Sequence, residues 1–457
     1  MRVVFFLLFS LLLLSGVVSP LRDIPHSSCS SKLHEHQHMN SSGVHFTLHH
    51  PRGPCSPASL QELSFSDVLQ HDVLRVSGLT SRLTTTKHRH RHRASSLATN
   101  HPSLVSVPLT PGSSLGVGNY ITKIGLGTPA SYFSMVVDTG SSLTWLQCSP
   151  CRISCHDQSG PLFDPSASST YHSVPCSSAE CSGLQSATLN PSACSSSHVC
   201  IYEASYGDSS FSVGYLSKDT LTIGSSPALS GFTYGCGQDN EGLFGHSAGL
   251  IGLAKDKLSL LSQLAPKLGN AFSYCLPTMS STGSLSIGSY DPSHFVFTPL
   301  VKSSLDNSLY FVKLSGIKVG GKVLSVPAST YSDTPTIIDS GTVITRLPPD
   351  VYTELSSAVS NALSKYPSAP AYSLLDTCFK GSAAGLAAPE VVVVFEGGAE
   401  WNLATRNVFI DVDDGTTCLA FASAGRVAII GNRLQQTFKV VYDVANSKLG
   451  FAAGGCG

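Results

Sequence analysis

Val136-Val137-Asp138-Thr139-Gly140-Ser141-Ser142 and Ile337-Ile338-Asp339-Ser340-Gly341-Thr342-Val343 are near copies of each other. Each begins with an apolar run, typical of a buried strand, that ends in a carboxylate on a turn. The glycine lets the backbone turn tightly beside the acid, and the neighbouring hydroxyls can donate hydrogen bonds that hold the carboxylate ionised and oriented. Two such turns facing each other make a pair of acids that share one proton, so that a water between them becomes a nucleophile.

This pair of stretches resembles the catalytic motifs of the pepsin-like aspartic proteases, Asp-Thr-Gly-Ser and Asp-Ser-Gly-Thr. One such triplet is also ordinary turn chemistry, whereas two copies behind apolar strands in matching halves are specific. The resemblance covers about residues 118–457. It implies an all-β fold of two pseudo-symmetric lobes, with a few short helices and a cleft between the lobes. The composition agrees, because 12% of the residues are charged and 40 are glycine, which favours strands and turns.

The chain of 457 residues is long enough for two lobes and removable segments. We expect a signal peptide at 1–20, a His/Arg-rich propeptide at 21–100, an N-terminal lobe at 101–295 that carries a cysteine-rich insertion and a flap, and a C-terminal lobe at 296–457. Arg2 and the apolar run 3–14 indicate secretion. A membrane anchor is the alternative, but the run is short for a spanning helix. We therefore expect a secreted, apoplastic protein with no membrane partner; vacuole and chloroplast are alternatives.

Residues 21–100, called the leader below, differ from the rest in charge. They hold 11 of the 17 histidines and nine Lys and Arg against five Asp and Glu, whereas the residues after 100 hold 18 Lys and Arg against 24 Asp and Glu. A basic leader beside an acidic body suits a propeptide that acts as an intramolecular inhibitor over the cleft. Apolar residues approximate a helical stripe, with a cap at Ser66–Asp67. They are Leu60, Leu63, Val68, Leu69, Val73 and Val76.

Other features of the leader bear on partners and location. Asn40 begins an Asn-x-Ser/Thr glycosylation site. The run Lys87–Arg93 alternates His with basic residues; a solvated cleavage region explains it, and a metal or nucleic-acid tract is the alternative. His50–Pro57 resembles propeptides of a plant subgroup that includes chloroplast nucleoid DNA-binding proteases, which keeps a DNA-binding organellar protease as an alternative.

The fourteen cysteines fit an oxidising compartment, where disulfides form. Many lie between Cys148 and Cys200, in a Ser-rich stretch that cannot build a core of its own. A zinc knuckle at Cys148, Cys151 and Cys155 is the alternative to disulfides. The stretch resembles the insertion of nepenthesin-type plant proteases. That resemblance implies the pairs Cys148–Cys151, Cys155–Cys236, Cys176–Cys200, Cys181–Cys194, Cys275–Cys456 and Cys378–Cys418.

The stretch 201–222 alternates about Tyr206-Gly207-Asp208-Ser209, a pattern typical of a hairpin. In the resembling family this hairpin is the flap that closes over substrate, and Tyr206 occupies its Tyr-Gly position. An ordinary surface tyrosine is the alternative. The resemblance also implies a hydrogen bond that braces the Tyr206 hydroxyl against the indole of Trp145.

Further patterns place the supporting elements. An apolar-apolar-Gly triplet follows each acid, Leu250–Gly252 in one half and Ile429–Gly431 in the other, and the resemblance implies strands beneath the catalytic loops. Helices are predicted at Asp256–Leu268, with Pro266 near its end, and from Pro348 onward. Phe438–Phe451 is typical of two strands about a turn.

The resemblance implies an aspartic endopeptidase, made as a zymogen, that hydrolyses protein or peptide substrates in acid without a metal or organic cofactor. Asp138 and Asp339 share the base and acid roles. Ser141 and Thr342 are expected to orient the carboxylates. The expected lining of the peptide path is Gly140, Gly341, Gly207 and Asp208.

Two rival functions follow from other features. A catalytically silent, protease-like inhibitor or binding protein is one alternative, although both acids and both glycines are intact. Nucleic-acid binding through the basic run is the other. Because that run precedes the expected mature start and the body is acidic, we expect the mature form not to bind nucleic acid. We also expect it to be a monomer.

Overall fold

The computed structural model describes residues 43–50, 64–89, 119–224, 228–279 and 281–454. The expected signal peptide, Asn40, and the cleavage region after Arg93 lie outside these ranges. None of the helices in the described part is both long and apolar enough to cross a membrane. Strands dominate, so the predicted all-β class is confirmed.

The largest sheet has 15 strands among the described residues. In spatial order these are β13 (Val296–Pro299), β28 (Lys448–Ala452), β27 (Lys439–Asp443), β11 (Ala271–Cys275), β12 (Thr282–Gly288), β1 (Gly43–His49), β2 (Ile121–Leu126), β3 (Ser131–Asp138), β10 (Gly249–Gly252), β4 (Trp145–Gln147), β9 (Leu229–Glu241), β8 (Phe211–Thr222), β7 (Cys200–Ser205) and β6 (Ala193–Cys194), with β5 (His172–Ser173) paired to β8. The sheet takes strands from both expected lobes, so the lobe boundary at residue 295 stays a prediction.

Three smaller sheets belong to the C-terminal half. Their spatial orders are β14 (Phe311–Val312), β17 (Thr336–Ile338), β26 (Ala428–Ile430), β18 (Thr345–Leu347), β25 (Phe421–Ser423); then β16 (Lys322–Val323), β15 (Leu314–Val319), β21 (Val391–Phe395), β22 (Glu400–Leu403); and β19 (Ser368–Ala369), β20 (Cys378–Lys380), β24 (Thr416–Leu419), β23 (Phe409–Asp413).

The two halves repeat one arrangement of strands around the acids. In the first, β3 pairs in parallel with β10, β10 antiparallel with β4, and β4 in parallel with β9. In the second, β17 pairs in parallel with β26, β26 antiparallel with β18, and β18 in parallel with β25. Gly252 lies opposite Asp138, and Ile430 lies opposite Ile338. Leu250–Gly252 thus lies within β10, and Ile429 and Ile430 lie in β26 with Gly431 directly after it, so a strand runs beside each acid strand where one was predicted.

Helices connect these sheets. They are α1 (Phe65–Arg89), α2 (Ala179–Thr188), α3 (Leu260–Leu268), α4 (Ala328–Ser332), α5 (Pro349–Ala362), α6 (Thr405–Val408) and α7 (Asn432–Gln435). The helix expected from Asp256 begins later, at Leu260, because the Ser259 side chain caps it by accepting the N–H of Ser262. The helix expected after Pro348 is confirmed as α5, and the two C-terminal strands are confirmed as β27 and β28.

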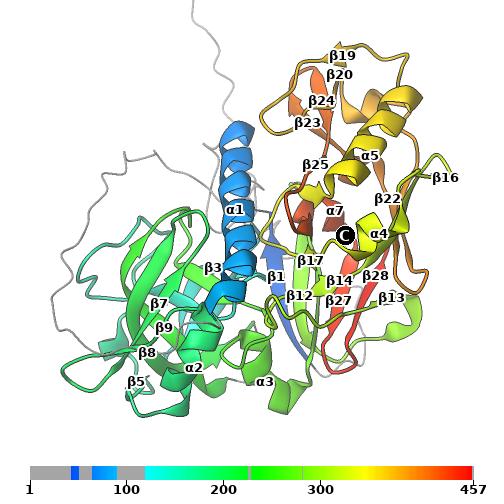
Figure 1. Ribbon diagram of the computed structural model, residues 1–457. Helices are drawn as coiled ribbons and strands as arrows, with labels where there is room; N and C mark the ends of the chain where they lie inside the picture. The colour runs from blue at the N-terminus through cyan, green and yellow to red at the C-terminus, as the bar shows by residue number, and fades with distance from the viewer. Residues whose placement is uncertain (1–42, 51–63, 90–118, 225–227, 280, 455–457) are drawn as a thin grey trace, which may run out of the picture. The chain divides into compact units, whose positions relative to one another are not determined.

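The leader supplies one strand and one helix. Strand β1 pairs along its length with β12, and Val44, Phe46 and Leu48 alternate into the core. Helix α1 starts two residues earlier than the cap predicted at Ser66–Asp67: Ser64 Oγ accepts the N–H of Asp67 at 3.2 Å, and Asp67 accepts the Ser64 N–H in return. Figure 1 shows α1 as a long blue helix standing between the strands of the first half and those of the second.

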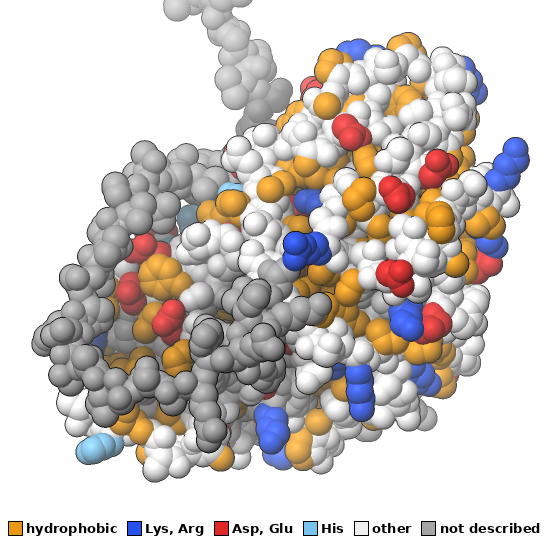
Figure 2. Space-filling view, viewed as in Figure 1, with side chains coloured by type: hydrophobic (Ala, Val, Ile, Leu, Met, Phe, Trp, Pro, Cys, Tyr) orange, Lys and Arg blue, Asp and Glu red, His pale blue; other side chains and the backbone are white. Residues whose placement is uncertain are grey.

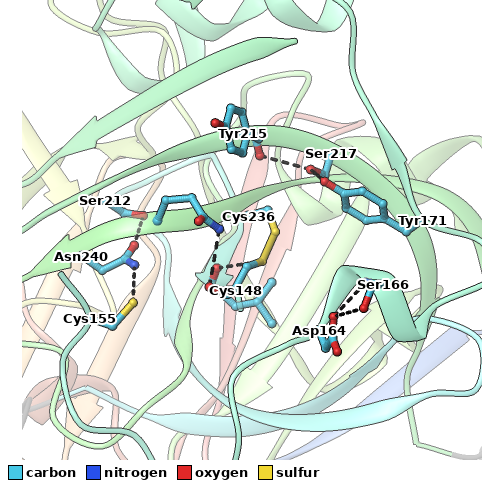
Figure 3. Close-up of a disulfide and its surroundings, with 12 residues drawn as sticks. Cys148, Cys155, Asp164, Ser166, Tyr171, Ser212, Tyr215, Ser217, Cys236 and Asn240 are labelled. Atoms are coloured by element: carbon cyan, nitrogen blue, oxygen red, sulfur yellow. Dashed lines mark hydrogen bonds between the residues drawn. A yellow bond between two sulfur atoms is a disulfide. The ribbon is translucent and has the colours of Figure 1, made fainter. Parts of the chain in front are cut away.

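The disulfides correct four of the predicted pairs. The observed bonds are Cys148–Cys236, Cys151–Cys155, Cys176–Cys194, Cys181–Cys200 and Cys378–Cys418, of which only the last was predicted. Strand β9 runs beside β4, and this brings Cys236 to Cys148, where Figure 3 shows the bond. Cys194 and Cys200 face each other across β6 and β7 but bond to different cysteines. Cys456 lies outside the described residues, so its pairing with Cys275 stays a prediction.

Candidate active site

Asp138 and Asp339 occupy equivalent turns at the ends of β3 and β17. Each side chain accepts the N–H of the glycine two residues later, Gly140 at 2.9 Å and Gly341 at 3.1 Å. Both aspartates are about 1% exposed. This local hydrogen bond orients each carboxylate from its own backbone, which is why the short motif suffices to form the turn.

The hydroxyls of the motifs tie the two turns together. Thr139 Oγ1 accepts the N–H of Ser340 at 2.8 Å, and Ser340 Oγ accepts the N–H of Thr139 at 3.2 Å. These side chains were expected to donate to the carboxylates, yet their stronger contacts cross between the halves. The cross-contact holds the two acids face to face, because each turn is bonded to the other's backbone.

The remaining hydroxyls are not equivalent. Thr342 Oγ1 donates to Asp339 Oδ2 at 2.7 Å, as expected for an orienting group. Ser141 does not play the matching part: its Oγ is buried and makes no hydrogen bond to any residue in the described ranges. Asp138 Oδ1 instead accepts from the Gly140 N–H and from Arg75.

Residues outside the motifs also support the turns. Thr144 Oγ1 accepts the N–H of Gly252 at 3.3 Å, and Thr345 Oγ1 accepts the N–H of Gly431 at 3.1 Å. Both glycines are required by close packing, since a Cβ on Gly252 would lie 2.2 Å from a backbone oxygen of the facing turn. The two threonines were not predicted as site residues, although they stand at the same spacing after each acid, a repeat that could have revealed them.

Arg75 of α1 contacts both acids. Its Nη2 lies 2.6 Å from Asp138 Oδ1 and 3.0 Å from Asp339 Oδ2, and its Nε donates to Asp339 Oδ2 at 3.0 Å. Burial works against the charge, but the two carboxylates raise the pKa of Arg75, so the guanidinium stays protonated. A Cβ on Gly341 would lie 2.1 Å from Arg75 Nη2. The guanidinium therefore fills the space that glycine leaves beside the acid.

Further charged residues of α1 contact the same region. Asp72 accepts from Arg346 Nη2 at 2.8 Å and from the N–H of Ile344 at 3.2 Å. Arg82 donates to Asp306 at 2.7 Å and to the carbonyl of Gly140 at 2.9 Å. None of these leader residues was singled out from sequence, because one Arg or Asp in a 25-residue helix carries no distinguishing signal.

Apolar side chains complete the contact of α1. Near its start, Val68 and Leu69 pack in a cluster with Val343 and Ile344. Further along, Leu79 and Leu83 pack with Phe311 and other residues around β17 and β26. Val73, placed on the predicted stripe, is 45% exposed instead, because the buried face of the helix runs through Leu69, Asp72, Leu79 and Leu83.

The hairpin predicted to be the flap is formed by β7 and β8. Trp145 Nε1 donates to the Tyr206 hydroxyl at 2.7 Å, which confirms the predicted brace. Phe244 packs edge-on against both rings. Burial raises the pKa of Tyr206, so its hydroxyl keeps its proton. The Asp208 side chain accepts the N–H of Ser210 at 3.0 Å and so shapes the tip of the hairpin.

The flap tip touches α1 backbone to backbone. A Cβ on Gly78 would lie 1.8 Å from the Cα of Gly207, so the contact exists only because both residues lack side chains. Beside it, a cavity of about 700 Å³ is lined by Asp138, Tyr206, Gly207 and Asp208 together with residues of α1 and α2. Gly140 and Ser141 line it as well. Within the described residues, no cluster of His, Cys, Asp or Glu is arranged to hold a metal ion.

Family models and known relatives match most of the chain. The xylanase inhibitor N-terminal family model matches residues 120–289 and the C-terminal model matches residues 309–453. An aspartyl protease family protein of Arabidopsis thaliana is 43% identical over 445 residues, 95% of this chain and 91% of that protein. Aspartic proteinase nepenthesin-2 of Nepenthes gracilis is 38% identical over 357 residues, 75% of this chain and 79% of that protein.

Solved structures extend the comparison to the fold. The crystal structure of basic 7S globulin from soybean has a TM-score of 0.60 and 22% identity, and the match covers 74% of this chain and 94% of that one. At this identity the likeness shows the fold alone, and it confirms the predicted bilobal class.

Proposed function

Because this chain belongs to the plant pepsin-like aspartic protease family, we propose that it is an aspartic endopeptidase, made as a secreted zymogen, that hydrolyses peptide bonds in acid. The observation that carries the proposal is the facing pair of acids, each oriented by its own glycine N–H. Its substrate is a protein or peptide, and it works as a monomer in the apoplast without a cofactor.

In this mechanism a water lies between the carboxylates of Asp138 and Asp339. One carboxylate takes a proton from the water while the water oxygen attacks the peptide carbonyl carbon. The other, protonated, donates to the carbonyl oxygen. As the C–N bond breaks, the first acid passes the proton taken from the water to the leaving nitrogen, and the second regains its proton as the carbonyl re-forms. Tyr206 and Gly207 close over the substrate, so that the reaction proceeds away from bulk water.

A binding protein is the second candidate, because the matching family models carry the name of xylanase inhibitors. Retention of both acids, both glycines and the tyrosine brace favours catalysis. Nucleic-acid binding is less favoured, since on the face in Figure 2 the basic side chains are interspersed with acidic ones rather than gathered in one patch.

The leader acts as the inhibitor in this proposal. Arg75 occupies the place of the attacking water and of the peptide carbonyl by binding both acids. Protonating either carboxylate removes one negative charge from this contact. The buried guanidinium of Arg75 then has less negative charge beside it to offset the cost of its burial. The loss of either negative charge therefore weakens the attachment of α1.

Histidines of β1 add to the same trend. Burial lowers the pKa of His49 from 6.5 to about 4, with Lys123 acting in the same direction. Burial and Lys439 also lower the pKa of His45, which contacts Ser286. A histidine whose pKa is lower in the paired strand than in the released strand binds protons better once released. Acidification from pH 6.5 towards 4 therefore favours withdrawal of β1.

We expect the purified proenzyme to be latent near neutral pH and to shorten itself in acid, with cleavage between about Arg93 and Gly118. Mass spectrometry over time, on the proenzyme and its Asp339→Asn variant side by side, measures this. Hydrolysis of a denatured protein, with and without pepstatin, is followed in the same samples. His49→Gln should process only at lower pH, whereas His172→Gln, an exposed histidine on β5, should not shift the onset.

Several outcomes count against this scheme. If Asp339→Asn shortens as fast as the parent, another protease performs the maturation. If the full-length protein already hydrolyses substrate at neutral pH, the leader is no inhibitor. If acidified, shortened protein hydrolyses nothing, the endopeptidase proposal is wrong and a binding role replaces it.

The flap role makes a separate prediction. Tyr206→Ala should lower kcat more than it lowers the free energy of unfolding, because the flap acts on bound substrate. Trp145→Phe should have a milder effect of the same kind, since it removes the N–H that braces the tyrosine. Steady-state kinetics and thermal unfolding measure the two quantities. Tyr215→Ala on the same hairpin is the control and should not lower turnover selectively; full activity of Tyr206→Ala would place the flap elsewhere.

A further inference from the structure

We propose that Arg346, together with the backbone N–H groups of Val343 and Ile344, forms a subsite that selects an acidic side chain of the substrate. The subsite is occupied by Asp72 of α1 while the leader is docked, and it opens to peptide when α1 leaves. This inference rests on the proposed endopeptidase function and names a substrate class for it: peptides with Asp or Glu near the cleaved bond.

The contacts of Asp72 define the subsite. One carboxylate oxygen accepts the N–H of Val343, and the other accepts the N–H of Ile344 at 3.2 Å and Arg346 Nη2 at 2.8 Å. The Asp72 side chain is 0% exposed and that of Arg346 is 5% exposed. Three donors converging on one buried carboxylate make a site for an anion, because charge-assisted hydrogen bonds of this kind recognise carboxylates with defined geometry.

The donors belong to the body of the protein, so the subsite survives the loss of the leader. Arg346 lies on β18, and its Nη1 donates to the carbonyl of Ile344 at 2.9 Å, which holds the guanidinium in place. Val343 and Ile344 follow directly on the second acid turn. Among the described residues, Asp72 is the carboxylate that pairs with Arg346. Without α1, a positioned cation and two backbone donors face the space that the Asp72 carboxylate leaves.

The distance to the acids limits where the selected side chain stands in a substrate. Asp72 precedes Arg75 by one helical turn, which is roughly 5 Å along the axis. An extended peptide covers that length in about two residues, at roughly 3.3 Å per residue. The acidic side chain is therefore expected within about three residues of the cleaved bond.

Matched peptides test the subsite. Each peptide carries one Asp, moved one position at a time along either side of the cleaved bond, and has a partner with Asn there. At about pH 5.5 the peptide carboxylate is ionised. For the acid-activated enzyme we expect kcat/KM to favour Asp over Asn by about tenfold or more at one position. Arg346→Gln should bring that ratio near one.

Further variants separate charge from fold. Arg346→Lys should keep part of the ratio, because lysine retains the charge but not the planar fork. Arg152→Gln, an exposed arginine between Cys151 and Cys155, should leave the ratio unchanged. If Arg346→Gln does not fold, the parent enzyme supplies a second measurement: added salt should lower its Asp-to-Asn ratio, because the selectivity is electrostatic.

The possible results distinguish this inference from the proposed function. If the Asp and Asn peptides are hydrolysed at equal rates at every position, the subsite proposal is wrong but the endopeptidase proposal stands. Asp72 and Arg346 then serve only to dock the leader. A ratio that persists in Arg346→Gln assigns the selectivity to other residues. Absence of hydrolysis of all peptides overturns the endopeptidase, and the subsite with it.

Discussion

Asp138→Asn and Asp339→Asn are each expected to abolish peptide hydrolysis while leaving the fold intact. Asparagine has nearly the shape of aspartate and can still accept the N–H of Gly140 or Gly341, but it cannot take up the proton of the attacking water. We expect kcat to fall roughly ten-thousandfold or more for either variant. Because each variant also removes self-processing, the assay uses protein whose leader has been removed by an added protease.

The double variant sharpens this prediction. If the acids act as one unit, losing both should be no worse than losing one, so the effects should not multiply. Asp414→Asn, an exposed aspartate in the turn between β23 and β24, is the control and should keep full turnover. Circular dichroism and thermal unfolding establish that the variants fold. Near-normal turnover in either single variant would refute the assignment of the dyad.

Arg75→Met is expected to abolish the latency of the proenzyme. The methionine keeps much of the apolar stem but leaves both carboxylates without the cation that α1 brings to them. Removing one partner of a buried ion pair costs about 3 kcal/mol or more, which is roughly a hundredfold shift towards released leader. The measurement is hydrolysis of a small peptide by the unprocessed variant, at a pH at which the parent is silent.

A glycine pair provides an independent test of the same docking. Gly78→Ala places a Cβ 1.8 Å from the Cα of Gly207, so α1 or the flap has to move and the leader is held less tightly. Gly183→Ala in α2 is the matched control, because a Cβ there meets nothing within 4 Å. We expect Gly78→Ala to activate at higher pH than the parent, and Gly183→Ala to activate at the parental pH. If Arg75→Met and Gly78→Ala both stay latent, α1 does not hold the enzyme inactive.

Local features could be predicted from the sequence because short stretches determine them. An acid followed by Ser or Thr and then Gly bonds to its own backbone two residues on, so the turns of Asp138 and Asp339 form wherever the chain lies. The same holds for the strands before the acids and for α5, which begins at a proline. The brace between Trp145 and Tyr206 followed from the resemblance, which carries tertiary information that the residues alone lack.

The disulfide pairs depend on contacts between segments that are far apart in the sequence. Cys148 and Cys151 are near in sequence, yet Cys148 bonds to Cys236 because β9 pairs with β4, a contact set by the packing of the whole sheet. Likewise Thr139 and Ser340 were placed in their motifs correctly, but their bonds to each other depend on how the two halves meet. The sequence of either segment alone does not indicate which distant residue it contacts.

The sequence by itself determined the acid turns, the repeated strands and the opposition of charge between leader and body. Only the tertiary structure decided that Arg75 reaches both acids, that Asp72 binds Arg346, and that Gly78 meets the flap. A helix presents each side chain in a direction that its sequence sets, but what lies there depends on where the helix docks. The position of α1 depends on many contacts along its length, so no single residue of the leader predicts where the helix docks.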